Sequence, residues 1–172
     1  MNQKIYITRG LSGAGKSTWT REAVQRFKNS IRISRDEIRF MLWNGDMVND
    51  DKEVFFIRNS MMEVALKNGY NLIIDETYLA PHRVQQLNNL ILAFATQMNK
   101  SFDIEIQDFI WEDIEKCIER DKPRGKNRHV GEAFIRSYYE NYILPLRENI
   151  GVTRWTIEPN KDEYPKTTGN ES

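Results

Sequence analysis

The sequence has few of the features that mark secreted, membrane-spanning or strongly polyionic proteins. It holds a single cysteine, Cys117, which excludes an internal disulfide. No apolar run approaches the roughly 18 residues that a membrane-spanning helix needs, and the apolar run in residues 1–8 is too short for a signal peptide. Basic and acidic residues number 25 each, so no global field favours a nucleic acid or a membrane surface. We expect a cytoplasmic protein without membrane contact.

The chain does have the size and the alternating pattern of an α/β domain, with 172 residues of which 40% are apolar. Short apolar runs predict strands at 4–9, 31–34, 71–75, 102–109 and 152–157. Helical apolar spacing predicts helices at 17–28, 53–68, 83–98, 112–120 and 131–147. This alternation predicts a central parallel sheet of four or five strands with helices on both faces. We assign residues 1–158 to this domain and expect the polar residues 159–172 to form a disordered tail.

A phosphate-binding loop stands between the first predicted strand and the first predicted helix. Residues 10–17, GLSGAGKS, fit the pattern G-x-x-x-x-G-K-[ST] without a gap. Glycines let several backbone N–H groups point at phosphate oxygens, and the helix N-terminus adds positive charge. This P-loop NTPase-like motif predicts binding of ATP, with Lys16 on the β- and γ-phosphates and Ser17 on Mg²⁺. The residues expected at the triphosphate are Gly10, Ser12, Gly13, Ala14, Gly15, Lys16, Ser17 and Thr18.

A candidate catalytic base follows the second predicted strand. Asp36 lies just past the strand end, where parallel sheets bind their ligands, and Arg39 follows on the same face of a helix. The carboxylate could accept the proton of an attacking hydroxyl, and the arginine could hold a phosphate in bidentate fashion. The same pattern equally fits an acid at a helix start and a surface arginine.

The third predicted strand ends in Asp75, Glu76 and Thr77. A carboxylate here would emerge beside the phosphate loop and could serve Mg²⁺, a water in its shell or a neighbouring arginine. Thr77 could bond an acceptor. All three would also suit a turn or a helix cap, and the residues alone leave the alternatives open.

A basic segment at residues 120–130 is the densest cluster of positive charge in the chain. Its basic residues before the histidine at 129 are Arg120, Lys122, Arg124, Lys126 and Arg128. Pro123 and Gly125 break any helix here. The segment fits a mobile lid that brings arginine to the charge developing between the β- and γ-phosphates, and it also fits a solvated basic loop. The aromatic residues at 134–142 are more typical of a core than of a base-stacking platform.

Taken in order, the stretches GLSGAGKS, SRDEIR, DETYLAPHR and ERDKPRG resemble the P-loop polynucleotide 5′-hydroxyl kinases, among them the kinase domain of the phage polynucleotide kinase-phosphatase. The resemblance covers about residues 3–147, and its R-D-x-x-R and R-x-x-x-R-G spacings are narrower than the phosphate loop. It implies transfer of the γ-phosphate of ATP to the 5′-OH end of single-stranded DNA or RNA. No D-x-D-G-T motif is present, so we expect no 3′-phosphatase activity.

The resemblance also implies a role for each matching residue around the site of transfer. Asp36 would be the general base, and Arg39 would contact a phosphate of the acceptor strand. Lys16 and Arg124 would act on the donor phosphates, with Arg120 in support. A functional link to a nucleic-acid ligase is implied, as is a place in the host cytoplasm if a phage encodes the chain. A homo-oligomer stays open.

On the acceptor side, Glu76 and Thr77 match the family's Asp-Thr pair, and Asp75 is an additional acid in front of it. Val130 and Phe134 would line the path of the acceptor strand.

Two other functions fit the same motifs. A small-molecule kinase for a sugar, a nucleoside or an antibiotic needs the loop and the base, but not an Arg39 contact with a backbone phosphate. A nucleic-acid-stimulated ATPase would transfer the phosphoryl group to water. Residues 71–76, NLIIDE, come closest to the acidic motif that such motors carry.

Overall fold

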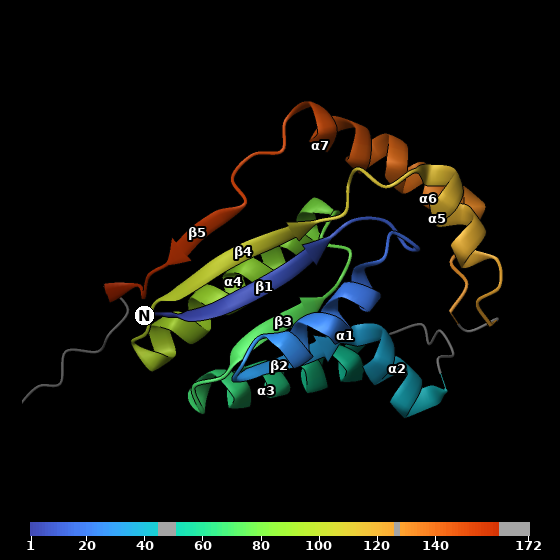
Figure 1. Cartoon of the computed structure of the whole chain (residues 1–172). Coiled ribbons are helices and arrows are strands. Elements are labelled where there is room, and N and C mark those ends of the chain that lie inside the picture. Colours follow the sequence, from blue (N-terminus) through green and yellow to red (C-terminus); the bar gives the residue numbers. More distant parts are fainter. Residues whose placement is uncertain (45–50, 126–127, 162–172) are drawn as a thin grey trace, which may run out of the picture.

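The computed structural model describes residues 1–44, 51–125 and 128–161, and it shows a five-stranded sheet in the order β2-β3-β1-β4-β5 (Figure 1). The strands are β1 Gln3–Arg9, β2 Ser30–Ser34, β3 Asn71–Asp75, β4 Phe102–Asp108 and β5 Arg154–Ile157. The first four run parallel, and β5 pairs antiparallel with β4. The predicted α/β fold with a mostly parallel central sheet is confirmed. The last strand differs because the chain returns from the carboxyl end of the sheet without the crossover that a parallel strand requires.

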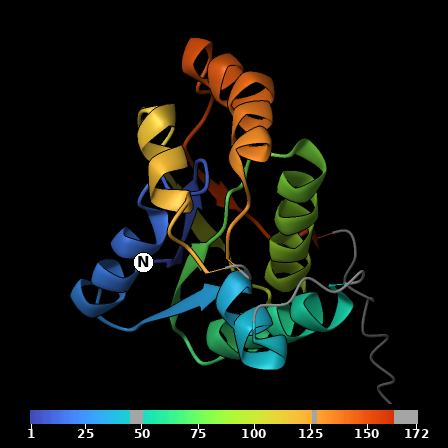
Figure 2. The same cartoon turned by 90° about the vertical axis from the view of Figure 1, so that its right-hand side faces the viewer.

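Helices flank the sheet and cover its carboxyl end. Helix α1, Lys16–Arg26, lies on one face, whereas α3, Lys52–Lys67, and α4, Pro81–Met98, lie on the other (Figures 1 and 2). Helix α2, Arg35–Trp43, follows β2 directly. The remaining helical segments lie beyond the strand tips and are α5 Ile114–Asp121, α6 Glu132–Tyr138, η1 Tyr139–Ile143 and α7 Leu144–Glu148.

The main core lies between the sheet and the α3–α4 layer. The strands are apolar along most of their length because both faces of a parallel sheet are covered. Register aligns Ile5 with Leu72 and Ile7 with Ile74 across β1 and β3. Phe102 of β4 is also fully buried in this cluster. The core therefore fixes β1 in the middle of the sheet, with the phosphate loop at its carboxyl end.

A second core lies beyond the strand tips. Its buried members are Leu11, Ala14, Leu79, Ile110, Cys117, Ile118, Ile135 and Ile143. Tyr138, Tyr139 and Tyr142 pack against it, as predicted for this aromatic stretch. Because the cluster joins residues of the phosphate loop to residues of α5 and α6, it holds the loop against the helices that follow β4.

The helix predicted over 131–147 is interrupted in the structure. A π-helical turn, η1, separates α6 from α7, and Pro145 lies just after it. Proline lacks an N–H and its ring crowds the preceding turn, so a widened turn before it relieves the regular helix.

Some expectations fall outside the part of the chain that the structure describes. Residues 162–172 of the expected tail and residues 126–127 of the basic segment are among these. Within the described ranges, every helix is too short or too polar to cross a lipid bilayer.

Candidate active site

The phosphate loop adopts the conformation that its glycines predict. Between the end of β1 and the start of α1, Gly13 and Gly15 take φ values of 80° and 95°. These values lie in the left-handed region, which residues with a side chain rarely enter. No heavy atom lies within 4 Å of the place where a Cβ of Gly15 would stand, so the loop is open at this position. This open cradle at a helix N-terminus fits a phosphate group.

Gly13 must also be glycine for a second reason, because the loop packs directly against the backbone of α5. A Cβ at this position would lie 2.4 Å from the backbone oxygen of Cys117. Only glycine can occupy this place without moving one of the two segments. The phosphate loop is therefore seated on α5 through backbone contact.

We expect Gly13→Ala to destabilise the protein more than a glycine substitution that adds strain alone. Gly69 is a matched control, because its φ of 82° is similar and no heavy atom lies within 4 Å of the place where its Cβ would stand. Gly69→Ala should cost about 1–2 kcal/mol of unfolding free energy. Gly13→Ala should cost more and also weaken ATP binding, as measured by urea unfolding and nucleotide titration. Equal losses in both variants would contradict the seating of the loop on α5.

Lys16, the first residue of α1, is 8% exposed, and its Nζ donates to the Leu11 backbone oxygen at 2.5 Å. Burial lowers the pKa of Lys16 from 10.5 to about 8. The carboxylates of Asp75 and Asp36 oppose this shift, and the Arg124 guanidinium adds to it. The candidate base, the acid at the end of β3 and the basic segment thus all lie within electrostatic reach of one lysine.

This lowered pKa predicts that ATP binding takes up protons in mildly alkaline solution. The free Lys16 loses its proton as the pH rises through about 8, whereas a bound triphosphate favours the ammonium form. The association constant should therefore fall by up to about tenfold per pH unit above pH 8 and be insensitive to this group below pH 7. Calorimetry at pH 9 in two buffers of different ionisation enthalpy measures the uptake. Lys16→Arg, which stays protonated, should take up none at this position, and equal uptake by both proteins would exclude Lys16 as the source.

Asp75 faces the donor side of the sheet. Its Oδ2 accepts hydrogen bonds from Thr20 of α1 at 3.1 Å and from Arg32 at 2.5 Å. Arg32 also binds Thr20 and Glu37, at 2.7 and 2.8 Å. Asp75 is 7% exposed, and through Oδ2 it joins β3 to α1 and to Arg32 of β2.

Glu76 faces the opposite side. Its Oε1 accepts from Nη1 of Arg58 at 2.8 Å, and Nε of Arg35 lies 3.0 Å from the same oxygen. The next residue, Thr77, bonds the phosphate loop through its backbone oxygen, which accepts from the Gly10 N–H at 3.0 Å. The two adjacent acids at the end of β3 thus have different partners. Asp75 contacts α1 and Glu76 contacts α3, a distinction that the sequence alone did not give.

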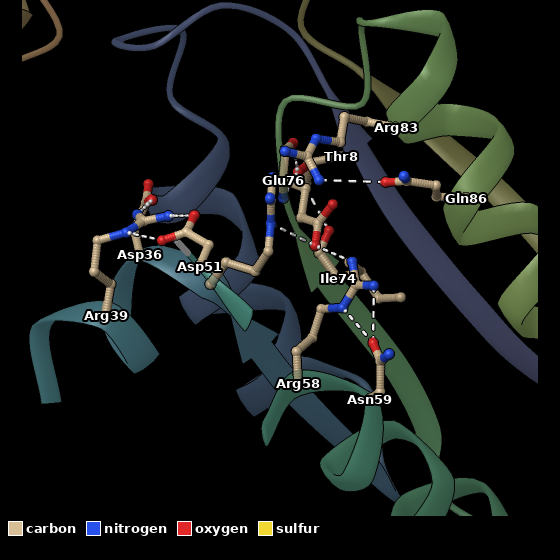
Figure 3. A network of polar contacts seen from close by, with 11 residues as sticks. Thr8, Asp36, Arg39, Asp51, Arg58, Asn59, Ile74, Glu76, Arg83 and Gln86 are labelled. Carbon is tan, nitrogen blue, oxygen red and sulfur yellow. Dashed lines mark hydrogen bonds and ion pairs between the residues drawn. The ribbon is translucent and has the colours of Figure 1, made fainter. Parts of the chain in front are cut away.

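Asp36 and Arg39 form a pair on the first turns of α2. Arg39 Nη1 donates to Asp36 Oδ1 at 2.8 Å, and the other side of its guanidinium binds both oxygens of Asp51 (Figure 3). The Asp36 side chain is 88% exposed, whereas that of Arg39 is 12% exposed. The carboxylate is therefore accessible from solvent, and the arginine that orients it is held in place.

Both predicted arginines of the basic segment touch the phosphate loop. Arg120 Nη1 donates to the Gly13 backbone oxygen at 3.1 Å, and Arg124 Nη1 donates to the Ser12 hydroxyl at 2.8 Å. With the loop, with Trp19 and Thr18 of α1 and with Glu112, they line a cavity of about 420 Å³. This hollow opens on the outer side of the phosphate cradle, where a nucleoside attached to the phosphates could lie.

Asp121 is a residue of this site that the sequence patterns did not single out. It is 1% exposed and accepts hydrogen bonds from the backbone N–H groups of Val130 and Gly131, at 3.1 and 3.0 Å. It also accepts from the Ser12 hydroxyl at 3.3 Å. The acid ties both ends of the basic segment to the phosphate loop. Only the sequence position of an acid amid arginines hinted at this role.

Val130 and Phe134 lie at the start of α6 and are 43% and 44% exposed. The Phe134 ring stacks on that of Tyr138 at a centroid distance of 4.2 Å. Neither residue contributes to the donor cavity. Ser17 and Thr18 follow Lys16 in the first turn of α1, where the Ser17 hydroxyl could hold Mg²⁺ beside a triphosphate.

Solved structures with a similar fold define the class. A chain from the Pnkp1/Rnl/Hen1 RNA repair complex matches with a TM-score of 0.79 and 19% identity, over 95% of this chain and 51% of that one. Another chain, from a Pnkp1/Rnl/Hen1 complex, matches with a TM-score of 0.59 and 25% identity, over 69% and 39%. Shikimate kinase from Acinetobacter baumannii matches with a TM-score of 0.51 and 18% identity, over 86% and 80%.

The sheet, the phosphate loop and these similarities show that the chain has a P-loop kinase fold. Residues 5–144 match the model of the AAA_33 family, described as an AAA domain, and the chain belongs to that family. Membership implies use of a nucleotide, for which ATP and Mg²⁺ are the usual pair in this class. The chain spans about half the length of the matched chain of the RNA repair complex.

Proposed function

We propose that this protein is a kinase that transfers the γ-phosphate of ATP to the 5′-hydroxyl end of single-stranded DNA or RNA. One observation carries the proposal: the accessible Asp36 carboxylate lies within electrostatic reach of Lys16 and is paired at 2.8 Å with Arg39. A solvent-accessible carboxylate close enough to Lys16 to influence its charge can receive the hydroxyl of an acceptor that enters from solvent. The arginine beside it suits an acceptor that carries phosphate.

The donor would lie in the cradle of the phosphate loop. Backbone N–H groups of Gly13 to Lys16 face the phosphates, Lys16 neutralises the β- and γ-groups, and the nucleoside occupies the cavity lined by Trp19 and Arg120. Mg²⁺, held on this chain by the Ser17 hydroxyl, supplies charge neutralisation when bound. Asp75 keeps α1 and β3 together through Thr20, which fixes the cradle against the strand.

In the transfer step, the oxygen of the 5′-hydroxyl forms a bond to the γ-phosphorus, and Asp36 accepts the proton of that hydroxyl. The bond from that phosphorus to the β,γ-bridging oxygen breaks, and ADP leaves with the electron pair. Arg124, which touches Ser12 at the loop, stabilises the charge on the bridging oxygen. Arg39 holds the acceptor phosphate next to the reacting end.

The remaining predicted residues belong to the acceptor side of the proposal. Glu76 and Thr77 follow the end of β3. Val130, just before α6, and Phe134, on α6, would offer exposed apolar surface to the acceptor. A 5′-phosphate end is what a strand-joining reaction consumes, so the proposal includes a functional link to a nucleic-acid ligase. The similarity to a chain of an RNA repair complex supports this link.

Labelled γ-phosphate tests the proposal. Purified protein is incubated with γ-labelled ATP, Mg²⁺ and a 5′-OH oligonucleotide, and thin-layer chromatography separates labelled strand from orthophosphate. We expect labelled strand. Orthophosphate without labelled strand would indicate an ATPase and overturn the proposal. A nucleoside 3′-phosphate should be a better acceptor than the nucleoside, and equal rates would favour a small-molecule kinase.

A further inference from the structure

Three arginines from three helices surround one aromatic ring at the acceptor side of the sheet. The guanidinium carbons of Arg35 in α2, Arg58 in α3 and Arg83 in α4 lie 5.0, 5.0 and 4.7 Å from the ring centre of Phe55. No two of these carbons can therefore be more than about 10 Å apart. In Figure 3, Arg58 and Arg83 reach toward Glu76 from opposite sides.

The charges in this cluster do not balance among the described residues. Glu76 is the carboxylate in contact with it, and it accepts a hydrogen bond from Arg58 at 2.8 Å. Nε of Arg35 lies 3.0 Å from the same oxygen, yet it is buried and makes no well-aligned hydrogen bond within the described part of the chain. Arg83 Nη1 donates to the neutral side chain of Gln86 at 3.2 Å. Three positive charges thus meet one negative charge in a largely desolvated place.

Such an arrangement favours an anion. Each guanidinium offers five N–H donors in a fixed plane, and most of those on Arg35 and Arg83 make no hydrogen bond to another described residue. The ring of Phe55 stabilises each cation through its negative face, but it does not cancel the repulsion between them. A phosphate would supply both the missing charge and the missing acceptors.

The cluster lies outside the donor cavity. The donor cavity is lined by the phosphate loop, α1 and the α5 side, and none of its lining residues belongs to α2, α3 or α4. Arg35 directly precedes Asp36, and Glu76 directly follows Asp75. The cluster therefore adjoins the proposed base in the chain and does not line the donor cavity. Arg39, the nearby arginine assigned to the acceptor, is held by Asp36 and Asp51 and is not part of the cluster.

We propose that Arg35, Arg58 and Arg83 form a second phosphate-binding site, which holds a phosphodiester of the acceptor strand farther from the 5′ end than the phosphate at Arg39. The proposal rests on the proposed function. Arg58, 4% exposed and bonded to Glu76, fixes the cluster. Arg35 and Arg83, which are half-buried, supply the donors to the phosphate. Acceptors with two phosphates should therefore bind better than acceptors with one.

Binding of a 5′-OH oligonucleotide with a fluorescent 3′ end tests this site without catalysis. Anisotropy titrations at several salt concentrations compare the native protein with Arg83→Gln, which leaves the Glu76 contacts intact. We expect about tenfold weaker binding and a salt slope reduced by about 0.7. Arg83→Lys, which keeps the charge, should retain the salt slope. Arg154→Gln, on β5 with a side chain 76% exposed, is the matched control and should change neither quantity.

The outcomes separate this inference from the proposed function. If the native protein binds and labels the oligonucleotide and Arg83→Gln binds it equally well, the second phosphate site is overturned and the kinase assignment stands. Failure of the native protein both to bind and to label the oligonucleotide would overturn the proposed function, and the inference with it. A kinetic arm gives an independent reading: a second phosphate on the acceptor should raise kcat/KM in the native protein and not in Arg83→Gln.

Discussion

Replacing Asp36 by asparagine is expected to lower kcat for phosphate transfer to a 5′-OH oligonucleotide by about 100- to 10,000-fold. Asparagine has nearly the same shape and can still accept a hydrogen bond from Arg39, but it cannot take the proton of the attacking hydroxyl. Because the Asp36 side chain is 88% exposed, the substitution should leave folding intact. KM for ATP should change little, since the donor cavity does not include this residue.

Glu119→Gln serves as the control, since Glu119 is an exposed acid on α5 and lies outside the donor cavity. It should transfer phosphate at the native rate. Single-turnover rates with labelled ATP measure both variants, and thermal unfolding verifies that they are folded. A rate for Asp36→Asn within a few-fold of the native rate would remove this carboxylate from the mechanism.

Arg124→Ala should reduce kcat by about 1,000-fold or more, the range found for arginines that stabilise a transferring phosphoryl group. The guanidinium already touches the phosphate loop through Ser12 at 2.8 Å, and it lies close enough to influence Lys16. Its charge matters most when negative charge builds up on the bridging oxygen. The loss should therefore appear in kcat far more than in the dissociation constant for ATP.

Lys122→Ala gives the matched comparison. Lys122 belongs to the same basic segment and is exposed, and it does not line the donor cavity. Its removal should change kcat by less than about twofold, because an exposed charge outside the site contributes little. Parallel losses of kcat in both variants would mean that the segment acts through its general charge rather than through Arg124.

Local patterns predict the framework of this protein well. The five strands, the phosphate loop between β1 and α1, and the start of a helix at the Asp36 stretch depend on residues close in sequence. The antiparallel direction of β5 was not predicted, because it arises from how the chain returns after α7. The π turn before Pro145 was not predicted either, although the proline that accounts for it is visible in the sequence.

The partners of Asp75 and Glu76 could not be predicted from the sequence. Successive side chains of an extended chain point to opposite faces. Asp75 ends β3 and Glu76 directly follows it, so these neighbours meet different helices. Asp75 meets Thr20 of α1, and Glu76 meets Arg58 of α3. Those partners lie 55 and 18 residues away, and no local spacing indicates them. Asp121, whose bonds reach back to Ser12 over 109 residues, was not predicted for the same reason.

The backbone contact between Gly13 and Cys117 limits which substitutions the phosphate loop and α5 can accept, in evolution or in protein engineering. The same helix, α5, bears Arg120 and leads directly to Arg124, and both arginines touch the phosphate loop. On the proposed function, the parts that bind the nucleotide and stabilise the developing charge therefore form one structural unit. If the phosphate loop or α5 were transferred alone into a related protein, the transferred segment would lack the backbone contact that supports it. On the proposed function, the arginines assigned to the acceptor lie on α2, α3 and the beginning of α4, outside the donor cavity. Substitutions of those arginines should therefore change the acceptor preference without disturbing the nucleotide-binding half.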